Sequence, residues 1–92
     1  MAGQRRYHVY IDENAEKELA ALPKGVQPRV TRKIDGLELD PRPRNCKKLE
    51  DASADLYRVR VGVYRVIYYV DDDAPEVLVV RIRHRKDAYR RM

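Results

Sequence analysis

The sequence predicts an α+β fold in which an N-terminal strand and a two-helix hairpin pack on an antiparallel sheet ending in a three-strand meander. Between residues 15 and 37, apolar side chains recur every three or four positions, which is the spacing of helices that pack on a core. From Leu56 onward the period changes to two, which is typical of strands in a sheet with one wet face. A chain of 92 residues suffices for one core, so we expect a single domain over residues 1–92.

The first half of the chain contains the predicted N-terminal strand and both helices. Residues 7–11 alternate loosely and predict a short strand, and Asp12 is a favourable N-cap for the helix that follows. Two prolines in segment 40–43 end the second helix, and residues 44–55 are expected to be irregular. The apolar stripes consist of Ala15, Leu19 and Leu22 in the first helix, and of Val26, Val30, Ile34 and Leu37 in the second.

The second half predicts three strands, over residues 56–61, 63–70 and 77–84. Gly62 lies between the first two and favours a tight hairpin with a type II′ turn. Residues 71–75 form the second connection, and its three consecutive aspartates indicate turn chemistry rather than a metal site. Residues 85–92 are expected to form a short helical turn at the C-terminus.

Composition favours a polyanionic partner in the cytoplasm. Lysine and arginine number 20 against 15 acids, and the excess is concentrated from Arg81 to the end of the chain. Cys46 is the only cysteine, which predicts a reducing compartment, no internal disulfide and no metal cluster built on cysteine. We expect no cofactor. No apolar run approaches the roughly 20 residues of a membrane span, so no membrane association is expected.

Arginines gather on one predicted sheet face. If Gly62 and Val63 form a two-residue loop, Arg60 lies opposite Arg65, and Arg58 points to the same face because strand side chains alternate. Arg81 and Arg83 also share one face of the last strand. Like charges that face each other destabilise a sheet by a few tenths to about 1 kcal/mol, so a bound polyanion would explain them. The alternative is an ordinary wet face on which arginine is a common residue.

Other candidate residues are individually less specific. His84 ends the last strand and could act as an acid or base near neutral pH, although a lone histidine is more often a surface residue. Tyr89 could contribute to a site or cover the core, and Lys47 with Lys48 could bind a polyanion or simply favour solubility. The sequence contains no phosphate-binding loop, no nucleophile elbow, no zinc-protease motif and no paired-cysteine motif.

Three segments together resemble the toxins of the RelE/ParE superfamily, and in particular its RelE-type members. They are residues 47–49 (KKL), 56–68 (LYRVRVGVYRVIY) and 79–90 (VVRIRHRKDAYR). The resemblance extends over nearly the whole chain, in order and with matching spacing, and it implies the fold predicted above in its RelE-like form. RelE-type toxins are expected to enter the ribosomal A site and cleave messenger RNA without a metal, using the 2′-hydroxyl of the RNA as nucleophile.

The resemblance also implies which residues act. Arg65 and Arg85 would clamp the scissile phosphate, Tyr89 would stack on a base or donate a proton, and His84 is a further catalytic candidate. Residues expected to bind RNA are Arg58, Arg60, Arg81, Arg83, Lys47 and Lys48. Some relatives have lysine where this chain has Arg58 and Arg60, and because arginine holds its proton too tightly to be a convenient base, the proton-transferring group stays open.

Two other functions are compatible with the sequence. A ParE-type toxin would inhibit DNA gyrase without enzymatic activity on the same fold, although the tail with His84, Arg85, Asp87, Tyr89 and Arg90 favours the RelE type. A non-toxic binding module is the second alternative. For either type of toxin, the family implies a cognate RelB-like antitoxin as partner, and for the RelE type also the ribosome and messenger RNA.

Overall fold

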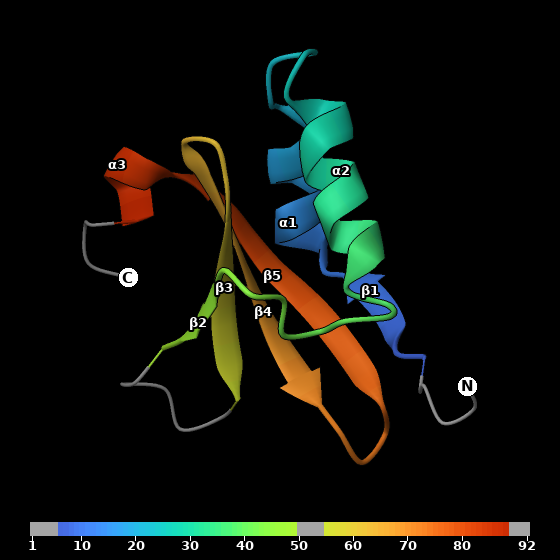
Figure 1. The fold of residues 1–92 in the computed structure, drawn as a ribbon. Helices are drawn as coiled ribbons and strands as arrows, with labels where there is room; N and C mark the ends of the chain where they lie inside the picture. Colours follow the sequence, from blue (N-terminus) through green and yellow to red (C-terminus); the bar gives the residue numbers. More distant parts are fainter. Residues whose placement is uncertain (1–5, 50–54, 89–92) are drawn as a thin grey trace.

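A five-stranded sheet with two helices on one face forms the framework of the protein (Figure 1). The structure is a computed structural model, and it describes residues 6–49 and 55–88. The strand order is β1-β5-β4-β3-β2. In chain order the elements are β1 (His8–Ile11), α1 (Glu13–Ala20), α2 (Gln27–Gly36), β2 (Cys46–Lys48), β3 (Leu56–Val61), β4 (Tyr64–Asp71), β5 (Glu76–His84) and α3 (Arg85–Ala88).

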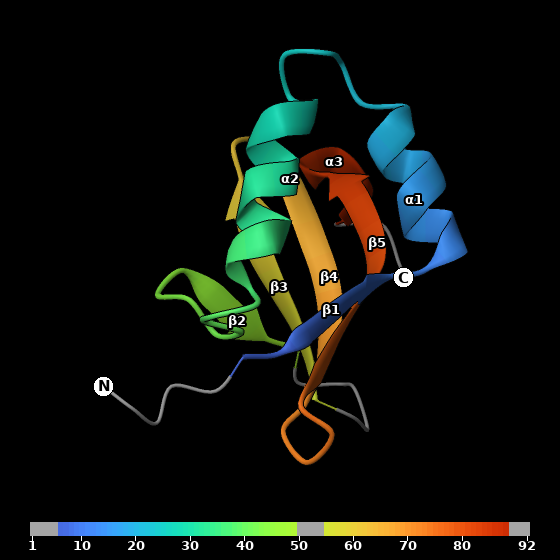
Figure 2. The same cartoon turned by 90° about the vertical axis from the view of Figure 1, so that its right-hand side faces the viewer.

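Helices α1 and α2 form where the apolar spacing predicts them, and they cover one face of the sheet (Figure 2). The carboxylate of Asp12 caps α1 by accepting from the backbone N–H groups of Asn14 at 2.8 Å and Ala15 at 3.2 Å. The core lies between the helix pair and the sheet. Its fully buried side chains include Val30 and Ile34 of α2, Leu37 directly after α2, and Val59, Val66, Tyr68, Val77 and Val79 of the sheet. No helix in the described ranges is long and apolar enough to cross a membrane.

The β3–β4 hairpin has the predicted register, with Arg60 opposite Arg65 and Val59 opposite Val66. Gly62 has a φ of 61°, and no other residue type has a positive φ in the described part of the chain. A positive φ at the first loop residue alone is the type II′ pattern that the sequence predicts. The guanidinium of Arg29 also lies over this turn, because a Cβ added at Gly62 would be 3.2 Å from its Nη2.

Two features of the sheet differ from the prediction. The sheet is mixed rather than antiparallel, because β1 pairs with β5 in parallel, with Val9 opposite Val77. The long connection that parallel neighbours require is the chain between them, which contains both helices and the strands β2, β3 and β4. The segment predicted to be irregular contains the short edge strand β2, in which Lys47 lies opposite Arg58 of β3. The three residues of β2 show no clear alternation and so give no strand signal of their own. Strand β2 forms because the edge of β3 has backbone groups free to pair with it.

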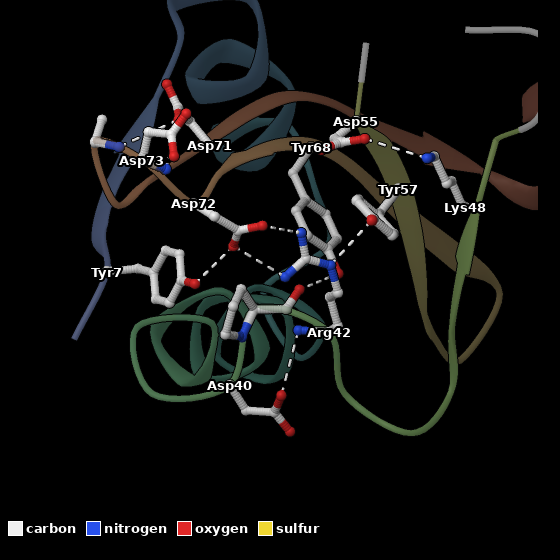
Figure 3. A network of polar contacts seen from close by, with 12 residues as sticks. Tyr7, Asp40, Arg42, Lys48, Asp55, Tyr57, Tyr68, Asp71, Asp72 and Asp73 are labelled. Carbon is white, nitrogen blue, oxygen red and sulfur yellow. Dashed lines mark hydrogen bonds and ion pairs between the residues drawn. The ribbon is translucent and has the colours of Figure 1, made fainter. Parts of the chain in front are cut away.

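A polar network fixes the segment that leads into β2 (Figure 3). The guanidinium of Arg42 donates to both carboxylate oxygens of Asp72, at 3.2 and 2.9 Å, and its Nε donates to the hydroxyl of Tyr57 at 2.9 Å. These hydrogen bonds raise the pKa of Arg42 above its usual value, and the hydrogen bond to Asp72 has the largest effect. The buried hydroxyl of Tyr68 donates to the Pro41 carbonyl at 2.8 Å, and burial raises the pKa of this phenol. The chain is therefore held against the sheet immediately before β2 begins.

Candidate functional site

The face of the sheet opposite α1 and α2 carries the candidate site. A β-bulge in the pairing of β4 with β5 sets which residues of β5 reach this face. On one side of the bulge Val79 lies opposite Tyr68, and both are fully buried in the core. On the other side Arg83 lies opposite Arg65, with the buried Ile82 turned toward the core. We call the face that carries Arg58, Arg60, Arg65 and Arg83 the arginine face.

Three arginines lie side by side across three strands of the arginine face. Arg60 of β3 is directly opposite Arg65 of β4, which in turn is directly opposite Arg83 of β5. Arg65, at the centre, is only 3% exposed, whereas Arg60 is exposed and Arg83 is half-buried. Arginine is rarely so buried, and here it lies next to two further positive charges. The row places three arginines on neighbouring strands of one face, and guanidinium groups suit the bidentate recognition of a phosphate.

A small pocket of about 20 Å³ lies at the β2 side of this row. Its lining consists of Asn45, Lys47, Arg58, Arg60 and Arg65. This volume is about that of one water-sized site, so it can hold one oxygen of a larger anion rather than a whole small molecule. The lining side chains carry four positive charges and one neutral amide, so the pocket favours an anionic oxygen.

The two lysines of β2 have different surroundings. Lys47 lies opposite Arg58 and lines the pocket, as its predicted RNA-binding role requires. Lys48 lies opposite Tyr57, whose side chain is buried, and its ammonium pairs with Asp55 at 3.2 Å. The structure therefore brings Lys47 into the group of arginines but not Lys48.

Arg81 contacts helix α1 rather than the pocket. Its guanidinium donates to both carboxylate oxygens of Glu18, with the shortest contact at 3.0 Å. The same carboxylate accepts the backbone N–H of Ile82 at 2.7 Å, at the edge of β5 beyond the end of β1. Glu18 thus accepts the backbone hydrogen bond that a neighbouring strand would otherwise accept. The positive charge of Arg81 neutralises the carboxylate of Glu18. This contact gives Arg81 a structural role that the sequence-based prediction of RNA binding does not include.

His84 lies on the side of the sheet opposite to the arginine face. It is directly opposite Tyr64, whose ring packs against the core, and the two rings meet edge to face at 5.3 Å between centroids. The Nδ1 atom of His84 accepts the backbone N–H of Lys86 at 3.1 Å, where α3 begins. The predicted catalytic histidine is therefore not brought together with Arg65, because neighbouring strand residues point to opposite faces.

Helix α3 starts with Arg85, next to the β3–β4 turn. The backbone N–H of Arg85 donates to the Val63 carbonyl at 2.6 Å, and its side chain is exposed. Figure 1 shows α3 on the side of the sheet away from α1 and α2. Arg85 can therefore approach the arginine face from the end of β5. Tyr89, the other predicted site residue of the tail, lies outside the described residues.

Asn45 is a site residue that sequence reasoning missed. Its side-chain amide donates to the Arg60 carbonyl at 3.4 Å, and the residue lines the pocket. A single asparagine before an unrecognised three-residue strand gives no sequence signal. Within the described ranges, no group of three or more histidine, cysteine, aspartate or glutamate side chains could hold a metal ion.

Comparison with known proteins assigns the chain to a family. Residues 9–89 match the family described as the ParE toxin of the type II toxin–antitoxin system parDE. The chain belongs to the RelE/ParE toxin superfamily. It is 31% identical to Toxin RelE of Mycobacterium tuberculosis over 90 residues, covering 98% of this chain and 93% of that protein. It is 34% identical to Toxin RelG of the same organism over 86 residues, covering 92% and 98%.

Solved structures of RelE proteins have the same architecture. The archaeal RelE–RelB complex from Pyrococcus horikoshii matches with a TM-score of 0.78 at 37% identity, covering 87% of this chain and 96% of that one. A mutant of the Escherichia coli toxin RelE in the free state matches with a TM-score of 0.72 at 26% identity, covering 91% of this chain and 87% of that one. The protein is therefore a RelE-like toxin of a toxin–antitoxin system.

Proposed function

We propose that this toxin is a ribosome-dependent, metal-independent endoribonuclease that cleaves messenger RNA in the A site and so inhibits translation. The observation that carries the proposal is the row of Arg60, Arg65 and Arg83, in register across three strands. Such a row costs the fold stability, because like charges directly opposite in a sheet repel. A bound RNA phosphate would compensate this repulsion, which gives the arrangement a function.

The geometry of the row suits an RNA phosphate that passes through a pentacoordinate transition state. In the proposed reaction, the 2′-hydroxyl of the RNA attacks the adjacent phosphorus, and negative charge accumulates on the non-bridging oxygens. Arg65 is held by its burial, so its guanidinium can stabilise that charge with little reorganisation. Arg60 and Arg83 approach from the neighbouring strands and would fix the orientation of the phosphate.

Further residues would extend the binding surface around this phosphate. Arg58 and Lys47 lie toward β2 and would contact the RNA backbone on that side. Arg85 would approach from the start of α3, and we assign Tyr89 the stacking or proton-donating role implied by the family. His84 and Arg81 are assigned structural roles on account of their contacts with Tyr64 and Glu18.

We further propose a RelB-like antitoxin as the cognate partner. Related RelE toxins from Pyrococcus horikoshii and Mycobacterium tuberculosis occur in toxin–antitoxin complexes, with sequences 37% and 30% identical to this one. The ribosome and messenger RNA are the proposed targets of the free toxin in the cytoplasm. A basic surface would favour association with ribosomal RNA, and this attraction would weaken as salt concentration rises.

A translation reaction with mapped messenger RNA tests the proposed activity. Purified toxin is added to ribosomes stalled with a defined empty A site, in the presence of a chelator, and cuts are mapped by primer extension. We expect cuts in the A-site codon that require ribosomes and disappear in an Arg60→Ala/Arg83→Ala double variant. An Arg32→Ala variant on the exposed side of α2 serves as control and should cleave like the unmodified protein. Intact messenger in every lane would contradict the proposal.

The alternative is a ParE-type toxin that inhibits DNA gyrase without cleaving nucleic acid. It is favoured by the description of the matching family, which names the ParE toxin. A DNA supercoiling assay with purified gyrase distinguishes the two functions. Inhibition of supercoiling together with intact messenger would identify the gyrase inhibitor, whereas an unaffected gyrase together with A-site cuts supports the ribonuclease.

A further inference from the structure

Apolar side chains form a row across four strands on the same face of the sheet as the arginines. Leu56 of β3 lies opposite Tyr69 of β4, Tyr69 lies opposite Leu78 of β5, and Leu78 lies opposite Tyr10 of β1. Their neighbours along each strand pack in the core, so the row faces away from α1 and α2 (Figure 1). We call these four residues the apolar row.

The apolar row is open to solvent in the described part of the chain. Tyr10 is 45% exposed, Tyr69 38% and Leu78 36%, and Leu56 is half-buried. Single exposed apolar residues are common on protein surfaces, but a contiguous group of them indicates a binding surface. Because the row runs in register across β3, β4, β5 and β1, its side chains are such a contiguous group.

Charges of opposite sign lie on the two sides of the apolar row. On one side, Arg65 is four residues from Tyr69 along β4, which corresponds to about 13 Å. On the other side, Asp71 of β4 lies opposite Glu76 of β5. Along its strands, this face of the sheet therefore changes from positive to apolar to negative.

This order of charges argues against RNA over the apolar row. An RNA strand has a negative phosphate at every nucleotide, so the carboxylates of Asp71 and Glu76 would repel it. A uniformly acidic peptide would be repelled there for the same reason. The face instead matches a partner with apolar groups in the middle, acidic groups at one end and basic groups at the other.

A second copy of this chain has the required pattern. A two-fold axis parallel to the apolar row reverses the direction of the strands, so the apolar rows of two copies meet each other. The same rotation brings the basic end of each copy toward the acidic end of the other. The face is therefore complementary to itself, which is the condition for a two-fold symmetric pair.

We propose that two copies of this toxin associate reversibly through their apolar rows. Residues near the axis meet their own counterparts, so Leu78 lies against Leu78 of the second copy. The contact covers Arg60, Arg65 and Arg83 and so makes the associated toxin unable to bind a polyanion at these residues. An interface with so few exposed apolar side chains is small, which corresponds to a transient pair rather than a permanent one.

Sedimentation velocity of the purified full-length toxin tests the proposal over a range of protein concentrations, in dilute salt and at about 1 M salt. The unmodified protein is compared with Leu78→Lys, with Leu78→Glu and with an equal mixture of these two variants. Leu39→Lys is the matched control, because Leu39 is 49% exposed and lies after α2 rather than in the sheet. Circular dichroism verifies that each variant is folded.

We expect the unmodified toxin to form pairs at high concentration in dilute salt and to dissociate at about 1 M salt, where the opposite charges are screened. Each Leu78 variant alone should associate at least about 100-fold more weakly, because like charges meet at the axis. The mixture should associate again, because the introduced lysine then meets the introduced glutamate. Leu39→Lys should behave like the unmodified protein.

Three results would overturn the proposal, and none depends on the proposed ribonuclease function. The first is an unmodified toxin that stays monomeric at every concentration in dilute salt; if the Leu78 variants then also lose antitoxin binding, the apolar row belongs to the antitoxin. The second is a mixture that fails to associate, which excludes the two-fold contact at Leu78. The third is association that strengthens with salt, which excludes pairing of the basic and acidic ends.

Discussion

Removing one arginine of the row should stabilise the protein and impair its activity at the same time. Arg60 is exposed and directly opposite Arg65, so an Arg60→Gln substitution relieves one cross-strand repulsion without emptying a core position. A like-charged pair of this kind is unfavourable by about 0.2–1 kcal/mol. For a domain of this size, 1 kcal/mol shifts the Tm by about 4–8 °C, so we expect an increase of about 1–8 °C.

Thermal unfolding followed by circular dichroism at two salt concentrations measures this effect. The Debye length falls from about 10 Å at 0.1 M salt to about 3 Å at 1 M, which is shorter than the distance between facing side chains. The gain in Tm should therefore be largest in dilute salt and small at 1 M. An Arg32→Gln variant on α2 controls for the loss of an arginine elsewhere and should change the stability by no more than about 0.5 kcal/mol.

Cleavage by the same Arg60→Gln variant gives the second half of the comparison. Loss of one charge-assisted hydrogen bond to the phosphate is worth about 1.5–3 kcal/mol, which corresponds to a roughly ten- to hundred-fold slower reaction. A lower Tm in dilute salt would refute the argument that the row costs stability. A stabilised variant with an unchanged cleavage rate would show that Arg60 is not needed for cleavage.

The remaining predictions concern three contacts that support the site. Asp72→Asn weakens the two-pronged contact with Arg42 and should lower the free energy of unfolding by about 1–2 kcal/mol, measured by urea titration, since the pair is partly exposed. Tyr68→Phe should cost about 1 kcal/mol at neutral pH. Because burial raises the pKa of Tyr68, the unfolded chain ionises first, so stability should fall above about pH 10, and more steeply in the unmodified protein than in this variant. Glu18→Ala should destabilise β5 by about 1–3 kcal/mol, and Arg81→Ala should lower stability without changing RNA affinity in a filter-binding assay.

The sequence predicts those elements whose local pattern and tertiary role agree. The hairpin of β3 and β4 follows from strict alternation around Gly62, and its register places Arg60 opposite Arg65 as expected. Helix α1 follows from Asp12 and the apolar spacing behind it. In these elements, the local sequence pattern agrees with the structure that the fold requires, so local rules suffice.

Elements that form only in the presence of their neighbours cannot be predicted from the local sequence alone. Strand β2 consists of Cys46–Lys48 and exists because β3 has an edge to pair with. The parallel pairing of β1 with β5 depends on how the whole chain between them folds, which no residue in β1 encodes. For the same reason, Asn45 and the distinct roles of Lys47 and Lys48 become evident only once β2 is placed.

The bulge between β4 and β5 decides which side chains form the site. With uniform alternation along β5, Arg83 would share a face with Val77 and Val79, both fully buried in the core. The register shift at Ile67 and Tyr68 inserts one residue, so that Ile82 joins the core and Arg83 turns outward to meet Arg65. The same shift turns His84 toward Tyr64 and away from the arginines. One unpaired residue therefore explains both why this site contains a third arginine and why the histidine beside it faces away from the arginines.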